Sequence, residues 1–97
     1  MDREVVLKRL AASIDEIRQR FSVRRLSVFG SVVRGESAKT SDVDVLVVFD
    51  GKASFDAFMD LKFYLEELLG TRVDLVTDKA IRPQIRRAIE AEIIDVA

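Results

Sequence analysis

A nearly unbroken apolar run, from Val43 to Phe49, constrains the fold of this chain more than any other feature. Such a run is typical of a β-strand that is covered on both faces. Two shorter β-prone runs accompany it, Leu26–Phe29 just before Gly30 and Val73–Val76. The sequence therefore predicts a small sheet built from three short strands.

Helical patterns alternate with these strands. Apolar residues recur at steps of three and four through the first twenty residues, which indicates an amphipathic helix with the stripe Leu7, Leu10, Ile14, Ile17 and Phe21. A second helix is predicted between a capping Ser54 and Gly70, with a core stripe of Phe55, Phe58, Leu61, Leu65 and Leu68. A third, with Pro83 in its first turn, presents Ile85, Ala88, Ile89 and Ile93. The expected class is α+β or α/β, with helices packed on one small mixed sheet.

The composition limits the kinds of catalytic and metal-binding site that this chain can form. The 97 residues suffice for a single domain over 1–97, and the chain has neither cysteine nor histidine. Disulfides, thiolate chemistry, Cys/His zinc sites and histidine bases are therefore excluded, and any metal must be held by oxygen, as Mg²⁺ or Mn²⁺ is. A net charge of −1 makes nucleic acid and anionic membranes unexpected partners. Without a signal-peptide pattern or membrane span, a cytoplasmic location is expected.

Two acidic residues stand at the entrance to the long apolar strand. Asp42 and Asp44 lie two apart, so in an extended backbone their side chains point to one face. Such a pair can hold one or two divalent ions for in-line phosphoryl displacement. Solvated loop-end acids are the alternative, but an acid beside a buried strand needs a partner or a metal. The strand follows the acids here, unlike in haloacid-dehalogenase-type phosphatases, and glycosyltransferases with Asp-x-Asp need a longer chain.

A glycine–serine pair precedes these acids. Gly30 permits close backbone approach to a ligand, and Ser31 can open a short helix whose free N–H groups bind phosphate, although a simple turn is the alternative. Gly35 indicates a turn or the end of that helix. Arg34 suits either a phosphate contact or an ion pair with Asp42, Asp44 or Glu36, and both interpretations stay open.

Together these residues resemble a known family. Gly30-Ser31, ten residues and then Asp42-x-Asp44 form a pattern similar to the signature of the DNA polymerase β-like nucleotidyltransferases. With Arg34-Gly35-Glu36 and Ser41 added, the pattern resembles the minimal branch, the MNT proteins. The resemblance covers nearly the whole chain and implies the polymerase β-like nucleotidyltransferase fold. It also implies Mg²⁺, with Mn²⁺ as a possible substitute, and a nucleoside triphosphate, ATP, as substrate.

The resemblance also implies the site residues. Asp42, Asp44 and a third carboxylate on a later strand, Asp74, would be catalytic and metal-binding, while Gly30, Ser31, Arg34 and Ser41 would bind nucleotide. An edge-strand acid facing water is the alternative for Asp74, and Glu36 and Asp78 are the fallback acids. Val32 and Val33 stand where the family often has Arg and Ala, which removes one cation from the phosphate site.

Three functions compete. The first is an Mg²⁺-dependent protein adenylyltransferase antitoxin, which the resemblance implies would transfer AMP from ATP to a tyrosine of a partner HEPN toxin. The second is a non-catalytic nucleotide-binding module that neutralises a HEPN partner by complex formation. Small-molecule transfer, as in aminoglycoside-modifying relatives, is disfavoured because those proteins carry an extra acceptor-binding domain. The arginine clusters at 18–25 and 82–87 are interpreted first as solvated surfaces or surfaces for a partner, and only second as groups that steer the nucleotide.

Overall fold

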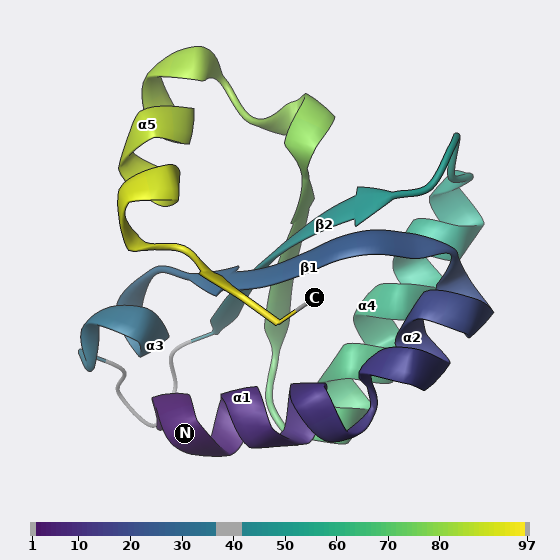
Figure 1. Ribbon diagram of the computed structural model, residues 1–97, viewed down its shortest axis with the longest axis horizontal. Helices are drawn as coiled ribbons and strands as arrows, with labels where there is room; N and C mark the ends of the chain where they lie inside the picture. The colour runs from purple at the N-terminus through teal and green to yellow at the C-terminus, as the bar shows by residue number, and fades with distance from the viewer. Residues whose placement is uncertain (1, 37–41, 97) are drawn as a thin grey trace.

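The computed structural model describes residues 2–36 and 42–96, and a mixed β-sheet lies at its centre (Figure 1). Within these residues the sheet has four strands in the order β3-β2-β1-β4. β1 is antiparallel to both of its neighbours, whereas β2 and β3 are parallel. The strands are β1 (Val23–Phe29), β2 (Val43–Phe49), β3 (Val73–Thr77) and β4 (Ile94–Asp95).

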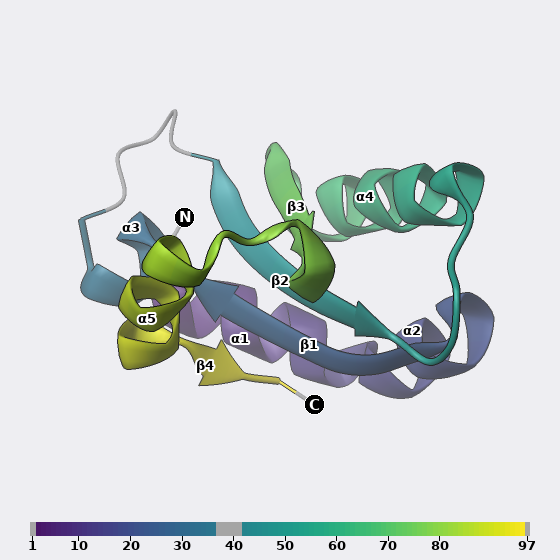
Figure 2. The same ribbon diagram turned by 90° about the horizontal axis from the view of Figure 1, so that it is seen from above.

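Helices lie on both sides of this sheet. Figures 1 and 2 show α1, α2 and α4 against one face, with α5 on the opposite side near the end of β1. The helices are α1 (Arg3–Ala12), α2 (Ile14–Phe21), α3 (Ser31–Arg34), α4 (Phe55–Leu69) and α5 (Pro83–Glu92), with a 3₁₀ turn η1 (Asp78–Ala80) after β3. The predicted class, a small mixed sheet with helices packed on it, is confirmed. In the described part of the chain, no helix is long and apolar enough to cross a membrane.

The hydrophobic core fills the space between the sheet and the layer formed by α1, α2 and α4. Alternate residues of β2 enter it, because side chains alternate between the faces of a strand. Leu46, on the opposite face of β2, is also only 2% exposed. The long apolar run is therefore covered on both faces near its middle, as predicted. The buried core residues include Val6, Leu10, Ile17, Leu26, Val28, Val43, Val45, Val47, Leu61, Leu65 and Leu69.

Several local signals are confirmed. The Ser54 hydroxyl accepts from the Ala57 N–H at 3.1 Å, Gly70 ends α4 in the left-handed conformation, and Pro83 stands in the first turn of α5. Gly35 likewise ends the short helix that Ser31 begins.

Other predictions were wrong in detail. The first helix is broken at Ser13 into α1 and α2, and Leu10 in the first and Ile17 in the second are both fully buried. Phe55 is 74% exposed and Ile85 52% exposed, although both were predicted to face the core. Helical periodicity shows which face of a helix is apolar, but not how far along the helix that face stays covered. The strand β4 was not predicted, since two residues give no periodic signal.

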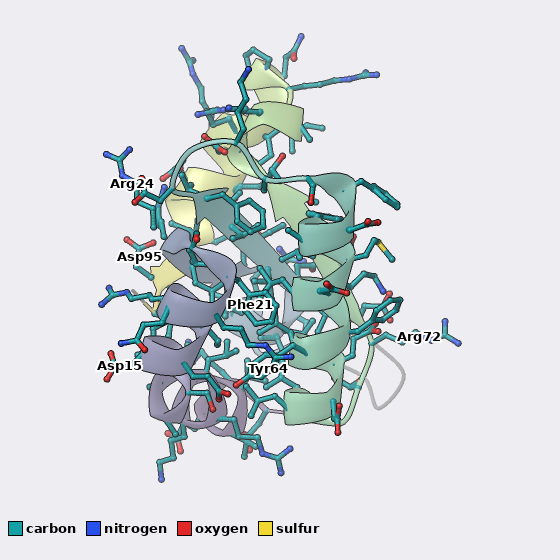
Figure 3. The ribbon with its side chains drawn as sticks, turned by 90° about the vertical axis from the view of Figure 1, so that its right-hand side faces the viewer. Asp15, Phe21, Arg24, Tyr64, Arg72 and Asp95 are labelled. Atoms are coloured by element: carbon teal, nitrogen blue, oxygen red, sulfur yellow. The ribbon has the colours of Figure 1, made fainter. Side chains whose placement is uncertain are left out.

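The first arginine cluster does not form a single patch. Arg20 lies over the rings of Phe21 and Tyr64, 5.2 and 5.5 Å from their centroids. Figure 3 shows these two rings meeting between α2 and α4, and their centroids are 5.3 Å apart. Arg25 instead pairs with Glu90 and Asp95. The arginines of this segment therefore serve different contacts.

Candidate active site

Two carboxylates meet where β2 and β3 begin. Asp44 and Asp74 are each the second residue of their strand, and the parallel ladder pairs them directly. Both lie on the sheet face turned away from α1, α2 and α4, because their neighbours Val43, Val45 and Val73 are buried in the core on the other side. Register in the sheet thus brings together two acids that are thirty positions apart in sequence.

Asp42 lies just ahead of β2 and is exposed, as is Asp74 on the edge strand β3. Asp74 thus occupies the exposed edge position that would suit a solvated acid. The same position places it beside Asp44. Asp44 itself is partly buried between its neighbours.

The electrostatics of these three carboxylates show that the residues described by the structure supply no neighbouring positive charge strong enough to balance them. Burial, followed by the negative charges of Asp74 and Asp42 and a hydrogen bond with Asp74, raises the pKa of Asp44 from 3.8 to about 6. The positive charge of Arg34 acts in the opposite direction, but more weakly. Carboxylates crowded in this way repel one another, and a hard divalent cation relieves that repulsion.

The fit to a metal rests on this crowding and on the oxygen-only donor set. Among residues 2–36 and 42–96, no three His, Cys, Asp or Glu side chains are already gathered closely enough to hold an ion. Asp44 and Asp74 are in contact, whereas Asp42 acts on Asp44 through charge alone. The residues fit a cation held first by Asp44 and Asp74, with the exposed Asp42 adding negative charge nearby.

Gly30 forms one wall of this site. Its φ of +81° is in the region that favours glycine, and an added Cβ would lie 2.0 Å from Oδ2 of Asp44. Glycine is therefore required here by the neighbouring carboxylate, in addition to any ligand. Ser31, the first residue of α3, is partly exposed, whereas Val32 is buried in the core. The valine that departs from the family pattern thus has a packing role.

Arg34 is held by two carboxylates at the end of α3. Its Nε donates to Glu36 at 2.6 Å and its Nη1 donates to Glu92 at 2.7 Å. The hydrogen bonds that Arg34 donates, to Glu36 first and then to Glu92, raise the pKa of the guanidinium further above its ordinary value. Of the three ion pairs considered for Arg34, the structure contains the one with Glu36.

Glu92 is the residue that sequence reasoning missed. Besides binding Arg34, its carboxylate accepts a hydrogen bond from the Gly30 N–H at 3.0 Å. Nothing in the local sequence marks Glu92, because its partners lie 58 and 62 positions away. The fallback acid Asp78 lies beyond the opposite end of β3, and Ser41 lies outside the described residues.

A groove of about 840 Å³ opens at the other end of the strands. It lies near Phe49, five residues along β2 from Asp44, or about 17 Å at the usual rise of a strand. Of the acids considered from the sequence, the groove contains only the fallback acid Asp78, and it contains none of the predicted catalytic or nucleotide-binding residues. Clustered carboxylates and a restrained arginine, the groups that phosphoryl chemistry needs, are at the amino ends of β2 and β3. We therefore place the candidate site there. The groove is lined by residues that include Arg24, Val48, Phe49, Lys52, Phe55, Phe58, Thr77 and Lys79.

Comparisons with known proteins identify the family of this chain. The family model described as "Nucleotidyltransferase domain" matches residues 10–96. The protein adenylyltransferase MntA of Thermococcus cleftensis is 46% identical over 87 residues, covering 90% of this chain and 88% of the relative. The structure of a candidate minimal nucleotidyltransferase is 37% identical and has a TM-score of 0.81, with 97% of this chain and 95% of that chain covered.

A more distant structure shares the fold. It is a chain from the complex of the tri-AMPylated HEPN toxin of Shewanella oneidensis with its MNT antitoxin, with a TM-score of 0.68, 16% identity, and coverage of 94% of this chain and 71% of that chain. The extent of the family match and the identity to the Thermococcus relative lead to one conclusion. This chain belongs to the nucleotidyltransferase domain family, and its class of activity is nucleotidyl transfer.

Proposed function

We propose that this chain is an Mg²⁺-dependent protein adenylyltransferase that transfers AMP from ATP to a tyrosine of a HEPN-domain toxin and so acts as an antitoxin. The observation that carries the proposal is the pairing of Asp44 with Asp74 across two parallel strands, against the Gly30 wall. The 46% identity to a protein adenylyltransferase supports a protein as acceptor. The AMPylated HEPN toxin found with a protein of the same fold supports the kind of partner.

In the proposed reaction the acceptor hydroxyl oxygen forms a bond to the α-phosphorus of ATP. The bond from that phosphorus to the oxygen bridging to the β-phosphate breaks, and pyrophosphate leaves. A divalent cation, when bound, supplies stabilisation of the negative charge on the phosphate oxygens. Asp42, Asp44 and Asp74 would hold it, which also offsets the repulsion that raises the pKa of Asp44.

The remaining residues would bind and orient. Asp74 is on the exposed edge of the sheet, where an incoming acceptor can reach it, so we assign it to the orientation of the acceptor hydroxyl and the removal of its proton. Gly30, Ser31 and Ser41 are assigned to the triphosphate on the basis of the family pattern. Arg34 supplies positive charge close to Asp44, where phosphate would lie.

The test is label transfer. The chain is incubated with α-³²P-labelled ATP, Mg²⁺ and a purified HEPN-domain partner, and the labelled residue is located by mass spectrometry. We expect label on a tyrosine with the wild type and none with Asp42→Asn. Asp50→Asn is the matched control, because Asp50 is an exposed acid at the opposite end of β2, and it should transfer normally. Absence of label with the wild type in both Mg²⁺ and Mn²⁺ would overturn the proposal.

A further inference from the structure

One carboxylate, that of Glu92, connects both ends of the short helix α3. Oε1 accepts from the backbone N–H of Gly30 at 3.0 Å, and Oε2 accepts from Nη1 of Arg34 at 2.7 Å. The Glu92 side chain is 24% exposed; its hydrogen bond with the Gly30 N–H is partly buried, whereas the one with Arg34 is exposed to solvent. The two contacts join residues from distant parts of the chain at the edge of the candidate site.

The sheet holds Glu92 in this place. Glu92 is the last residue of α5, and two residues later the chain pairs with β1 as β4. The Val96 N–H donates to the Leu26 carbonyl at 2.8 Å. Figure 1 shows the end of α5 beside α3 and the end of β1.

Asp95 secures the same segment. It accepts hydrogen bonds from the hydroxyl of buried Ser27 and from Nε of Arg25, the latter at 3.0 Å. The Ser27 hydroxyl first, and Arg25 after it, lower the pKa of Asp95, so this carboxylate stays ionised and bonded. The segment that carries Glu92 is therefore anchored to the sheet by Asp95 and by the pairing of β4 with β1.

The two contacts act on groups that matter for transfer. Gly30 packs so closely on Asp44 that a Cβ would overlap its carboxylate, so a shift of the Gly30 backbone displaces the wall on which Asp44 rests. Arg34 is restrained by Glu36 on one side and Glu92 on the other, which fixes the plane of its guanidinium. A group already held in position loses less freedom when a ligand binds.

We propose that Glu92 is a positioning residue for nucleotidyl transfer, acting through Gly30 on Asp44 and through Arg34 on the phosphates. This inference rests on the proposed function. It assigns to the C-terminal segment a role in the site, although the Gly-Ser and Asp-x-Asp residues of the family signature lie earlier in the chain.

Two variants separate its contacts. Glu92→Ala removes both hydrogen bonds, whereas Glu92→Gln keeps an oxygen for the Gly30 N–H and loses the charge that faces Arg34. Glu90→Ala is the matched control, because Glu90 is also an acid of α5 but pairs with Arg25 at 3.5 Å, away from Gly30. Thermal unfolding establishes that each variant is folded.

The measurements are kcat and KM for ATP in label transfer, and the amide hydrogen exchange of Gly30 followed by NMR. For Glu92→Ala we expect kcat/KM to fall at least about tenfold, the size of effect that losing a charge-assisted hydrogen bond produces. Exchange of the Gly30 amide should accelerate. Glu92→Gln should keep the Gly30 amide protected with kcat close to the wild type and show a raised KM. Glu90→Ala should stay within about twofold of the wild type, as expected of an exposed ion pair.

Three results would overturn the proposal: a folded Glu92→Ala with unchanged kcat and KM, unchanged exchange at Gly30, or tighter ATP binding in the variant. The last would mean that Glu92 competes with phosphate. If Glu92→Ala fails to fold, Glu92→Gln decides through its KM alone. A wild-type chain that transfers no label refutes the proposed function instead. The exchange rate of the Gly30 amide then still reports whether Glu92 holds the backbone at Gly30.

Discussion

Only glycine fits at position 30, because the Asp44 carboxylate occupies the space that a side chain would need. A side chain at Gly30 meets two obstacles, a φ of +81° and the Asp44 carboxylate 2.0 Å from the added Cβ. Gly51 has a similar φ of +85° but nothing within 4 Å of its added Cβ. The two glycines share a positive φ but differ in what an added Cβ would meet.

We expect Gly30→Ala to destabilise the fold more than Gly51→Ala, which should lose about 1–3 kcal/mol through strain alone. Urea unfolding of both variants measures the difference. The double variant Gly30→Ala/Asp44→Ala should recover most of that difference, because it removes the carboxylate that the new Cβ meets. Equal losses for the two single variants would show that the Asp44 contact does not matter.

The raised pKa of Asp44 predicts how stability depends on pH. Because its folded pKa, about 6, lies above the ordinary value of 3.8, the folded state holds the proton more tightly than the unfolded state. The stabilisation this gives is fully present below pH 3.8 and is lost as the pH rises through 6. Asp44→Asn cannot ionise, so it should become progressively more stable than the wild type between pH 4 and 6, with a constant difference above that.

Thermal unfolding in EDTA across this pH range checks the expectation for Asp44. Groups distant from Asp44 titrate alike in both proteins, so the difference between the two curves reports Asp44 together with the carboxylates that interact with it. Added Mg²⁺ should raise the melting temperature of the wild type more than that of Asp44→Asn at pH 8. A difference in melting temperature that is independent of pH would mean that Asp44 titrates normally.

At the scale of elements, Glu66 connects the end of α4 to the start of β3. Its Oε2 accepts from the Val73 N–H at 2.9 Å and from Lys62 Nζ at 2.9 Å. The Val73 backbone hydrogen bond first, and then Lys62, lower the pKa of Glu66. Since Asp74 follows Val73, this connection fixes the strand that carries the proposed third acid.

Glu66→Ala should therefore reduce the free energy of unfolding by about 1–3 kcal/mol, because the partly buried Val73 N–H loses its acceptor. Glu66→Gln should lose less, since its amide oxygen still accepts. The exposed neighbour Glu67 provides the control variant Glu67→Ala, which should stay within about 0.5 kcal/mol of the wild type. The contribution of the Glu66 charge is present above its ordinary pKa of 4.5 and lost as pH falls through the lowered value. Urea titrations at pH 7 and pH 3 would show both trends.

The elements also show which parts of this fold were predictable. Ser54, Gly70 and Pro83 act through their own backbone and nearest neighbours, so their signals are complete within a few residues. The two-residue strand β4 depends instead on pairing with β1, and no local pattern contains that information.

The same distinction applies to the candidate site. Asp42 and Asp44 could be selected from spacing and from the apolar strand that follows. Asp74 needed the family resemblance, because its place beside Asp44 depends on the register of two strands. Glu92 needed the structure, since a hydrogen bond across 62 positions leaves no trace in periodicity or spacing.

Across the whole molecule, the sheet separates two tasks. One face packs against α1, α2 and α4 and supplies most of the buried apolar surface. The other face presents Asp44 and Asp74 at the amino ends of β2 and β3. Substitutions on this second face can thus alter chemistry without opening the core, which makes the role of Asp74 testable in the intact protein.

Asp74→Asn distinguishes an enzyme from a module that only occupies its partner. If Asp74 orients the acceptor hydroxyl, its contribution is larger in the transition state than in the bound nucleotide. We expect transfer to fall by about 10²–10⁴-fold while the affinity for ATP changes little. Asp78→Asn is the control, because Asp78 lies in η1 past the opposite end of β3, and it should transfer at the wild-type rate.

The second half of this test is suppression of the toxin in cells that express it with either variant. One exposed acid beside Asp44 is a small part of any protein interface, so Asp74→Asn should still bind the HEPN partner in a pull-down. If suppression depends on transfer of AMP, cells with Asp74→Asn lose protection even though the complex forms, and this is the result we expect. Full protection by a variant that transfers no AMP would instead mean that binding alone neutralises the partner, and that the paired carboxylates serve a different step.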